Sequence, residues 1–416
     1  MIGVRKRHTC VVILGAGQAG FQAAASLRER DFEGRIILVG DEPGLPYQRP
    51  PLSKAALLTA IGADMSTPFR PAAYFTKHEI DLKYGTAARI DRDRRAVVLE
   101  SGERLEFDYL ILALGARNRI LTLPGADLAG VQQLRTLDDA ECIRSALETA
   151  TQVVAVGAGF IGMEIAAAAT KLGKQTSVID PLDRPMARSL SRPTSNHFAR
   201  LHTERGTLLH FGEHCSSFLG RESVEGVEFV NGESVAADLV IVGVGVEPRT
   251  ELAEAAGLAV DNGVEVDACL RTSDPAIFAI GDCARFPTGN GRDRVRIESV
   301  QNATDQARFV AAHITGAATE YAAVPWFWSQ QFDSKLQIAG LSTGSDVELV
   351  LGDQISSAFS VLRFRDSELT CVESVNKPAD HITARRILGH PRGLPLDVAR
   401  QGNFDLKSYA QNMVPA

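Results

Sequence analysis

Short apolar runs alternate with alanine-rich amphipathic stretches along the first two thirds of the chain. The run VVIL at 11–14 precedes a helical stretch, FQAAASLRER, and then a second apolar run, RIILVG. The same order returns as VVAV at 153–156, MEIAAAATKLGK and QTSVID. Such runs are typical of buried strands, and alanine-rich helices pack closely on sheets. The pattern predicts two βαβ units.

A glycine-rich loop joins the first strand to the helix in each unit, GAGQAG at 15–20 and GAGFIG at 157–162. In such a loop the first glycine permits a tight turn, the second lets the backbone approach a pyrophosphate, and the third lets the helix pack on the strand. The phosphates then lie at a helix N-terminus, where unpaired N–H groups favour negative charge. The sequence therefore predicts two phosphate-binding loops.

An acidic residue ends the second strand of each unit, Asp41 in one and Asp180 in the other. This is where a ribose hydroxyl is bound in dinucleotide-binding units, and we expect Asp180 to repel the additional phosphate of NADP. A solvated strand end is the alternative for each acid, but two complete units argue against it. The two loops begin 142 residues apart (157 minus 15), too far to serve one dinucleotide. If one dinucleotide is a nicotinamide, the other must accept its hydride, and FAD is the obvious candidate.

Composition narrows the class of protein. The 416 residues exceed one ordinary core, so two to three domains are expected. A content of 45% hydrophobic and 23% charged residues is ordinary for a globular protein, and a net charge of −7 argues against nucleic acid as a partner. No apolar run is long enough to span a bilayer, and the basic start MIGVRKRHTC reads as a short arm without a cleavage site. We predict a cytoplasmic protein with no membrane partner.

The six cysteines are scattered and include no CxxC pair. This disfavours electron transfer through a local redox-active disulfide. His210 and His214 have the spacing of neighbours on a helix, but we interpret them as part of a polar stretch. No metal site is predicted.

The segment YQRPPLSK at 47–54 places two prolines before a predicted helix start, with Ser53 and Lys54 in the first turn. A lysine there opposes the helix dipole. It is either a tolerated surface residue or a cation aimed at a cofactor. Further on, FDYLILALGARNR and ADLVIVGVGVEPRT each read as a strand that ends where the chain crosses between domains, and an apolar strand precedes Gly281 and Asp282.

Several of these segments together resemble a known superfamily. The ALG at 113–115, the second glycine loop, GVGVEPRT and above all IFAIGDCA resemble the FAD- and pyridine-nucleotide-dependent oxidoreductases that have two related nucleotide domains. Within that superfamily RPPLSK, LRTLDDAE, RIESVQNATDQAR and PWFWSQQ look like the putidaredoxin reductase-like family, the NADH-dependent ferredoxin reductases of bacterial monooxygenase systems. The resemblance covers nearly the whole chain.

The expected fold is α/β, with two Rossmann-like dinucleotide-binding domains of the glutathione-reductase-like kind and a small α+β C-terminal domain. The C-terminal domain follows from four alternating strand segments, LQIAGLS, VELVLG, SAFSVLRF and ELTCVESV, and the helix DHITARRILG. The predicted boundaries are 1–117 with 247–322 for the FAD domain, 118–246 for the NAD domain and 323–416 for the C-terminal domain.

The resemblance also implies site residues. Lys54 and Glu164 are the candidate catalytic residues, as an ion pair near flavin N5. The chain departs from the family pattern at two positions: Phe160 stands where the family often has Tyr, and Leu114 stands where it usually has Thr. The implied FAD contacts are Gly15, Gly17, Ala19, Gly20, Asp41, Lys54, Ala88, Arg135, Asp282 and Val300. The implied NADH contacts are Gly157, Gly159, Phe160, Gly162, Glu164, Asp180, Gly245 and Glu298.

The family resemblance implies that hydride passes from C4 of NADH to flavin N5, without a general base. The electrons then pass singly to a 2Fe-2S ferredoxin that supplies a haem-thiolate (cytochrome P-450 type) monooxygenase. Because such ferredoxins tend to be acidic, a local basic and aromatic patch is expected, with Arg308, Trp328 (or Trp326) and Lys407 as candidates. Core packing is the alternative for the tryptophans. The docking is expected to be transient, and the chain monomeric or at most weakly dimeric.

Other functions stay open at this point. Rubredoxin or oxygen would be a different acceptor for the same fold. A disulfide reductase would need the cysteine pair that the sequence lacks. A redox-sensing protein similar to apoptosis-inducing factor would be favoured by long basic surface segments, and the sequence contains none.

Overall fold

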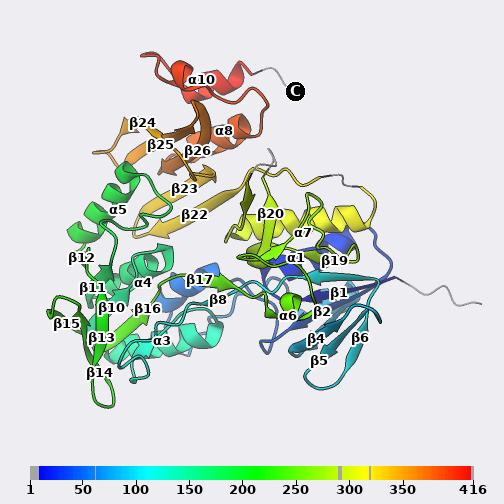
Figure 1. Ribbon diagram of the computed structural model, residues 1–416. Coiled ribbons are helices and arrows are strands. Elements are labelled where there is room, and N and C mark those ends of the chain that lie inside the picture. Colours follow the sequence, from blue (N-terminus) through cyan, green and yellow to red (C-terminus); the bar gives the residue numbers. More distant parts are fainter. Residues whose placement is uncertain (1–8, 61, 289–292, 318–319, 414–416) are drawn as a thin grey trace, which may run out of the picture. The chain divides into compact units, whose positions relative to one another are not determined.

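The structure is a computed structural model that describes residues 9–60, 62–288, 293–317 and 320–413 (Figure 1). The chain forms two compact units, one within residues 1–48, 66–117 and 246–323, the other within 49–65, 118–245 and 324–416. The basic arm predicted at the N-terminus lies almost entirely outside the described residues. The division into three domains with the boundaries given above stays a prediction.

The first unit contains a five-stranded parallel sheet, as the first βαβ pattern predicts. The helices α1 (Gln18–Glu29) and α7 (Val300–Ile314) pack against each other. The strands, in spatial order, are β19 (Ile277–Ala279), β7 (Tyr109–Leu112), β1 (Cys10–Leu14), β2 (Arg35–Gly40) and β3 (Ile80–Tyr84).

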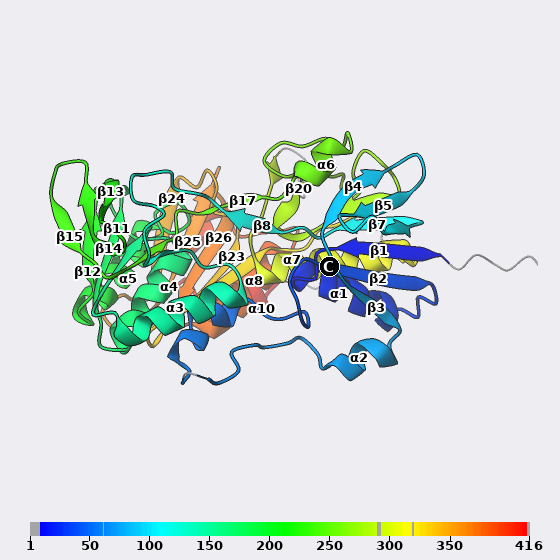
Figure 2. The same ribbon diagram turned by 90° about the horizontal axis from the view of Figure 1, so that it is seen from below.

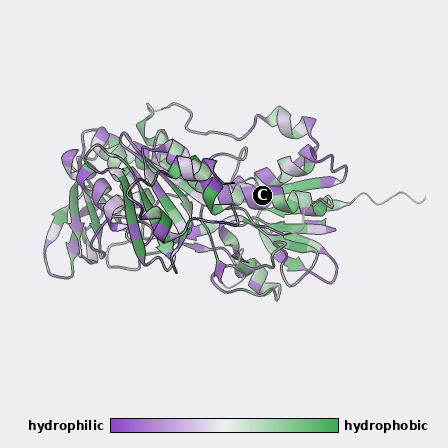
Figure 3. Ribbon diagram, turned by 90° about the horizontal axis from the view of Figure 1, so that it is seen from above, coloured by the Kyte–Doolittle hydropathy of each residue, from purple (hydrophilic) through white to green (hydrophobic). Residues whose placement is uncertain are grey.

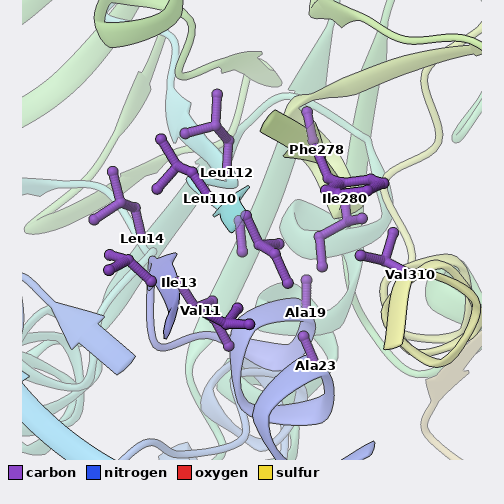
Figure 4. Close-up of a cluster of buried hydrophobic side chains, with 14 of the residues drawn as sticks. Val11, Ile13, Leu14, Ala19, Ala23, Leu110, Leu112, Phe278, Ile280 and Val310 are labelled. Carbon is purple, nitrogen blue, oxygen red and sulfur yellow. The ribbon is translucent and has the colours of Figure 1, made fainter. Parts of the chain in front are cut away.

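The core of the first unit lies between this sheet and its helices (Figure 4). The strands contribute mostly branched side chains, whereas α1 contributes mostly alanines, which let the helix approach the sheet closely. The buried residues include Val11, Ile13, Leu110, Leu112 and Phe278 of the strands, Ala19 and Ala23 of α1 and Val310 of α7.

The register of the strands brings three loops to one edge of the sheet. Leu14 pairs with Leu112, and Leu112 pairs with Ala279, so β1, β7 and β19 end side by side. The first glycine loop follows β1, and the 3₁₀ helix η3 (Gly281–Cys283) follows β19. Ligands bind at the carboxyl ends of parallel strands, and the loops at this edge are those that the sequence marks as candidates.

Smaller elements complete the first unit. The helices are α2 (Ala72–Lys77) and α6 (Glu251–Ala255), and the chain passes between the units at β8 (Ala116–Asn118) and just before β17 (Val246–Pro248), where domain crossings were predicted. Two three-stranded sheets consist of β4 (Ala87–Asp91), β5 (Ala96–Leu99) and β6 (Arg104–Glu106), and of β18 (Val264–Glu265), β20 (Ala284–Pro287) and β21 (Arg294–Val295).

The second unit also contains a five-stranded parallel sheet, with α3 (Leu137–Thr149) and α4 (Phe160–Lys171) packed on it (Figure 2). Its strands, in spatial order, are β12 (Leu208–Phe211), β11 (Gln175–Asp180), β10 (Gln152–Val156), β16 (Leu239–Val242) and β9 (Val131–Gln132). An antiparallel meander of β13 (Cys215–Gly220), β14 (Val224–Phe229) and β15 (Ser234–Ala236), and the helix α5 (Arg192–Glu204), belong to the same unit.

The C-terminal part of the second unit is an antiparallel sheet that shares a core with α4 and α5. The four strands predicted there are present, and so is the helix, α8 (Pro378–Leu388). A fifth strand, β22, holds the motif WFWSQQ and was not predicted as a strand. The sheet comprises β22 (Trp326–Gln331), β23 (Ser334–Gly340), β26 (Glu368–Val375), β25 (Ala358–Arg365) and β24 (Val347–Asp353), and α9 (Leu396–Ala399) and α10 (Leu406–Gln411) follow α8.

Hydrophobic residues are concentrated along the strands of these sheets (Figure 3). No helix in the described part of the chain is long and apolar enough to cross a membrane. In the same residues, no three or more His, Cys, Asp or Glu side chains gather where they could hold a metal ion.

One local prediction is wrong. No α-helix begins at Ser53 and Lys54; instead Pro50–Ser53 form a short 3₁₀ helix, η1, in which the prolines take the first positions. Lys54 follows that helix with φ −129° and ψ −105°, outside the helical region. The lysine therefore lies at a helix C-terminus, and the argument that it opposes a helix dipole does not hold. A second short helix, η2 (Ala56–Leu58), comes next.

Candidate cofactor and redox site

The first glycine loop has the geometry that its sequence predicts. Gly15 has φ +103°, and a Cβ there would lie 2.2 Å from the carbonyl oxygen of Ala113. A Cβ on Gly20 would lie 1.8 Å from the carbonyl oxygen of Gly15. By contrast, beyond the glycine and its two neighbours in the chain, no atom lies within 4 Å of a Cβ built on Gly17, the residue that caps α1. Two glycines are thus required by packing, and the middle one leaves open space at the helix N-terminus.

The second loop repeats this arrangement. Gly157 has φ +107°, and its Cβ would lie 2.4 Å from the carbonyl oxygen of Gly243. A Cβ on Gly162 would lie 2.0 Å from the carbonyl oxygen of Gly157, whereas the space around Gly159 is open to 4 Å. Each open position would let a pyrophosphate approach the backbone, so both loops fit a bound dinucleotide.

The two acids at the strand ends have different partners. Asp41 forms an ion pair of 2.6 Å with Arg249 of the same unit, and both side chains are partly exposed. Asp180 accepts hydrogen bonds from the backbone N–H groups of Ala158, at 2.7 Å, and Leu182, at 2.8 Å. The carboxylate of Asp180 is therefore fastened to the second glycine loop.

Other candidates in the first unit surround the end of β19. Gly281 has φ +73°, and its Cβ would lie 3.1 Å from the Cβ of Ala19, so η3 adjoins the start of α1. The N–H of Gly281 donates to Oε1 of Gln306 at 2.7 Å, which ties η3 to α7. Asp282 is half-buried, and Val300 is the first residue of α7. The structure thus brings Ala19 and the Asp282 segment together.

Two further candidate residues of this unit are Ala88, in the β4–β5 pair, and Glu298, which has an ion-pair partner. Ala88 is exposed and lies at a register shift between Ala87 and Arg89 in the β4–β5 pair. Glu298 forms an ion pair of 2.6 Å with Arg296.

Arg135, from the motif LRTLDDAE, lies at the start of α3. Thr136 is the N-cap, and its hydroxyl accepts from the N–H of Asp139, while the Asp139 carboxylate accepts from the N–H groups of Thr136 and Arg135, both at 2.8 Å. The carbonyl oxygen of Arg135 accepts from Arg49 Nη1 at 2.5 Å. Much of this motif is therefore explained by helix capping, a local signal that the sequence analysis did not use.

Lys54 and Glu164 form the predicted ion pair, with 2.7 Å between Nζ and Oε2. Glu164 lies on α4, just after the second glycine loop, and its side chain is 2% exposed, whereas that of Lys54 is 20% exposed. The hydroxyls of Ser53 and Ser329 also donate to this carboxylate, each at 2.6 Å. Lys54 Nζ lies 5.0 Å from the ring centroid of Trp328. The result is a buried carboxylate that accepts from three donors, two serine hydroxyls and the partly exposed Lys54 ammonium.

Aromatic side chains of β22 extend this group. The rings of Phe160, the first residue of α4, and Phe327 are 4.5 Å apart and tilted by 53°. Gly245 is the last residue of the segment 118–245 of the second unit, and its φ of +104° favours glycine.

Sequence reasoning did not single out Phe327, Ser329 or Gln331 as site residues. Their alternate spacing in WFWSQQ is the signal for one strand face, but nothing local says that this face meets α4.

The candidate docking residues differ in exposure. Arg308 on α7 and Lys407 on α10 are exposed, and Trp328 is half-buried. Trp326 is also half-buried, with Arg385 5.0 Å from its ring centroid and His381 at 5.2 Å. Neither tryptophan is fully buried in a core.

All six cysteines lie in the described residues, and none of them forms a disulfide. Cys283, in η3, is buried, and burial raises the pKa of its thiol to about 11. Burial likewise raises the pKa of Cys215 to about 11. These two side chains are thiols at neutral pH, so neither is a ready nucleophile.

Two family models match successive parts of the chain. Residues 9–307 match the family model described as pyridine nucleotide-disulphide oxidoreductase. Residues 326–410 match a second one described as reductase C-terminal. The two matches together take in both glycine loops and the antiparallel sheet that contains β22.

Individual relatives cover almost the entire chain. Rhodocoxin reductase of Rhodococcus erythropolis is 50% identical over 95% of this chain and 93% of its own. The reductase in the crystal structure of a covalent putidaredoxin reductase–putidaredoxin complex is 36% identical, with a TM-score of 0.92 over 97% of this chain and 99% of that one. A rubredoxin–NAD(+) reductase of Pseudomonas putida is 39% identical over 88% of this chain and 96% of its own.

Proposed function

Because this chain belongs to the pyridine nucleotide-disulphide oxidoreductases, and among them to the FAD-dependent ferredoxin reductases, we propose that it transfers electrons from NADH to a 2Fe-2S ferredoxin. We further propose that this ferredoxin supplies a haem-thiolate monooxygenase of the cytochrome P-450 type. The observation that carries the proposal is the pair of matching glycine loops, the second of which leads directly to the buried Glu164 and its ion pair with Lys54.

The enzyme uses FAD and a reduced pyridine nucleotide, as its family does. When bound, FAD accepts a hydride from the nicotinamide and releases the electrons one at a time. The open space at Gly17 and at Gly159 fits a pyrophosphate in each loop. The protein's share of the reaction is to bind, to orient and to set the local charge.

For FAD, we propose that the first loop holds the pyrophosphate and that Asp41 holds the adenosine ribose. Asp282 would bind the ribityl and pyrophosphate part, since η3 adjoins Ala19 at the start of α1. Val300 would approach the isoalloxazine. The remaining predicted FAD contacts are Gly15, Gly20, Lys54, Ala88 and Arg135.

For NADH, we propose that the second loop holds the pyrophosphate and that Asp180 holds the adenosine ribose. Its carboxylate is fixed by two backbone N–H groups and would lie against the additional phosphate of NADPH. Phe160 and Glu164 would flank the nicotinamide. The remaining predicted NADH contacts are Gly157, Gly162, Gly245 and Glu298.

The Lys54–Glu164 pair sets the charge where the hydride is transferred in this proposal. Because the Glu164 carboxylate is buried, water and salt screen this pair less than a fully exposed pair. The ferredoxin would dock through the exposed cations Arg308 and Lys407 and the half-buried Trp328. Charge steering of this kind favours a fast and transient encounter.

The test is NADH-driven reduction by the purified yellow protein, with and without a 2Fe-2S ferredoxin from a monooxygenase system. NADPH is run in parallel, and added salt should slow the ferredoxin reaction. Fast turnover that requires the ferredoxin and prefers NADH is the expected result. Rapid turnover with oxygen alone would instead identify an oxidase, and reduction by NADH into a long-lived complex that reduces no carrier would identify a redox sensor.

Rubredoxin is the second candidate acceptor, because a rubredoxin–NAD(+) reductase is 39% identical to this chain. The same assay with rubredoxin in place of the ferredoxin separates the two. A higher kcat/KM for rubredoxin would overturn the proposed acceptor while leaving the roles of FAD and NADH intact.

A further inference from the structure

The carboxylate of Glu164 is satisfied by donors from two separate segments of the chain. Oε2 accepts from the hydroxyl of Ser53 at 2.6 Å and from Lys54 Nζ at 2.7 Å. Oε1 accepts from the hydroxyl of Ser329 at 2.6 Å. A buried carboxylate is costly unless both oxygens have donors. Among the described residues, Oε1 therefore accepts from one donor, Ser329, whereas Oε2 accepts from two, Ser53 and Lys54.

Ser329 is itself held by a chain of hydrogen bonds in the interior of the second unit. Ser329 is fully buried on β22, and its hydroxyl oxygen accepts a hydrogen bond from Gln331 Nε2 at 3.4 Å. Gln331 Oε1 lies 3.0 Å from His202 Nε2. Burial lowers the pKa of His202 to about 4, so the ring is neutral at pH 7.

The direction of this chain follows from the chemistry of its members. A carbonyl oxygen only accepts, so the neutral His202 ring must carry its proton on Nε2 and donate to Gln331. Gln331 then donates to the Ser329 oxygen, which leaves the hydroxyl proton for Glu164. Every link points toward the carboxylate, so each donor in the row is polarised by the one before it.

From this geometry we propose that Ser329 is a positioning residue for reduction by NADH. Its hydroxyl holds Oε1 of Glu164, so that Oε2 stays directed at Lys54. The inference rests on the proposed role of the Lys54–Glu164 pair. It gives the antiparallel C-terminal sheet, through β22, a part in tuning the redox site in addition to any part in docking.

The test compares holoenzyme variants. Ser329→Ala removes the donor, and Ser329→Thr keeps it with a side chain that strands accommodate well. Ser360→Ala is the matched control, because Ser360 is equally buried in the same sheet and its hydroxyl also donates to a carboxylate, that of Asp380, at 2.8 Å. The measurements are the anaerobic rate of flavin reduction by NADH without any acceptor, the flavin absorption spectrum and the flavin midpoint potential.

We expect Ser329→Ala to slow flavin reduction about tenfold, since a buried charged acceptor loses its donor. The midpoint potential should move to a more positive value, because reduction adds negative charge to the flavin and a loosely held carboxylate offsets the Lys54 charge less. Ser329→Thr should restore both values, and Ser360→Ala should resemble the wild type in both.

An unchanged potential and spectrum in Ser329→Ala would overturn the inference, and so would an equal shift in Ser360→Ala. If Ser329→Ala does not fold, Ser329→Cys replaces it, because a thiol is a weaker donor of similar shape. Equal potentials for the Cys and Thr variants would then overturn the inference.

Failure of the proposed function gives a different result, because these readings precede any acceptor. A wild type that NADH reduces but that transfers no electrons to a ferredoxin would refute the proposed function and leave the inference standing. A wild type that reduces the ferredoxin, with Ser329→Ala behaving identically, would refute the inference alone.

Discussion

Lys54 Nζ lies 2.7 Å from Glu164 Oε2, although the two residues are 110 positions apart in the chain. The carboxylate is almost completely buried and the ammonium is partly exposed. Removal of either group therefore has unequal consequences. Loss of the cation leaves a buried charge, whereas loss of the carboxylate leaves a lysine that can reach water.

We predict that Lys54→Met lowers the free energy of unfolding by about 2 kcal/mol, since two serine donors still hold the carboxylate. The double variant Lys54→Met/Glu164→Gln should recover more than half of this loss, because the neutral amide needs no counter-charge. Equilibrium unfolding in urea at fixed FAD concentration measures both. Strict additivity of the two single effects would contradict the coupling.

The first glycine loop allows binding to be separated from folding. Gly20→Ala would force a Cβ to 1.8 Å from the Gly15 carbonyl oxygen, so we expect a loss of about 3 kcal/mol in unfolding free energy. Gly17→Ala meets open space with ordinary backbone angles, φ −72° and ψ −163°, so the fold should be retained.

The methyl group of Gly17→Ala should instead occupy the space proposed for the FAD pyrophosphate and weaken FAD binding at least about tenfold. Titration of the FAD-free protein with FAD measures the affinity, and thermal unfolding of the same sample is the control. A Gly17→Ala protein with normal FAD affinity would show that the pyrophosphate is not bound there.

Asp180 should determine the choice between NADH and NADPH. We predict that Asp180→Asn lowers the preference for NADH, as a ratio of kcat/KM values, about tenfold, because the amide no longer repels the additional phosphate. The amide oxygen can still accept one of the two backbone hydrogen bonds. Asp41→Asn, at the matching strand end of the first unit, is the control and should leave the ratio unchanged. A fall of the ratio in Asp41→Asn would show that Asp41, and not Asp180, selects the nucleotide.

The buried His202 should make the protein less stable in acid. Burial lowers its pKa from the ordinary value of 6.5 to about 4, so between these pH values the unfolded chain binds a proton that the folded protein does not. The free energy of unfolding should fall as pH falls through this window, by up to about 1.4 kcal/mol per pH unit, and level off below pH 4.

His202→Gln should remove this contribution from the pH profile. His197 and His381, whose pKa values burial also lowers to about 4, remain in the variant and act in the same direction. Burial raises the pKa of Glu373, which acts in the opposite direction, but it is common to both proteins. The difference between wild type and variant in urea unfolding at several pH values therefore isolates His202, and parallel profiles would exclude its neutral state.

The dinucleotide loops could be predicted from the sequence because their determinants are local. A strand, three glycines and a helix follow one another within about 20 residues. The steric demand on Gly20 comes from Gly15 inside that segment, whereas the carbonyl oxygen that excludes a Cβ on Gly15 belongs to Ala113, which the sheet brings beside it. The four later strands of the C-terminal sheet were predicted for the same reason, from alternation along short runs.

Two local features were misread or overlooked. The prolines of RPPLSK were interpreted as preceding a helix, but they occupy the first positions of a four-residue 3₁₀ helix. The TLDD of the LRTLDDAE motif is a capping box, with Thr136 and Asp139 each bonded to the other's backbone. Both signals are present in the sequence, but prolines and capping residues fix where a helix starts more reliably than how long it runs.

The sequence by itself determined the two nucleotide-binding units, their glycine loops and the acids that follow them, because each depends on residues close together in the chain. Only the tertiary structure decided which side chains surround Glu164. Ser53 and Ser329 lie 111 and 165 positions away from it, and a serine carries no mark of its partner until β22 packs against α4. Because the carboxylate is buried there, it needs each of these donors to offset the cost of removing its charge from water, and burial is set by the tertiary structure.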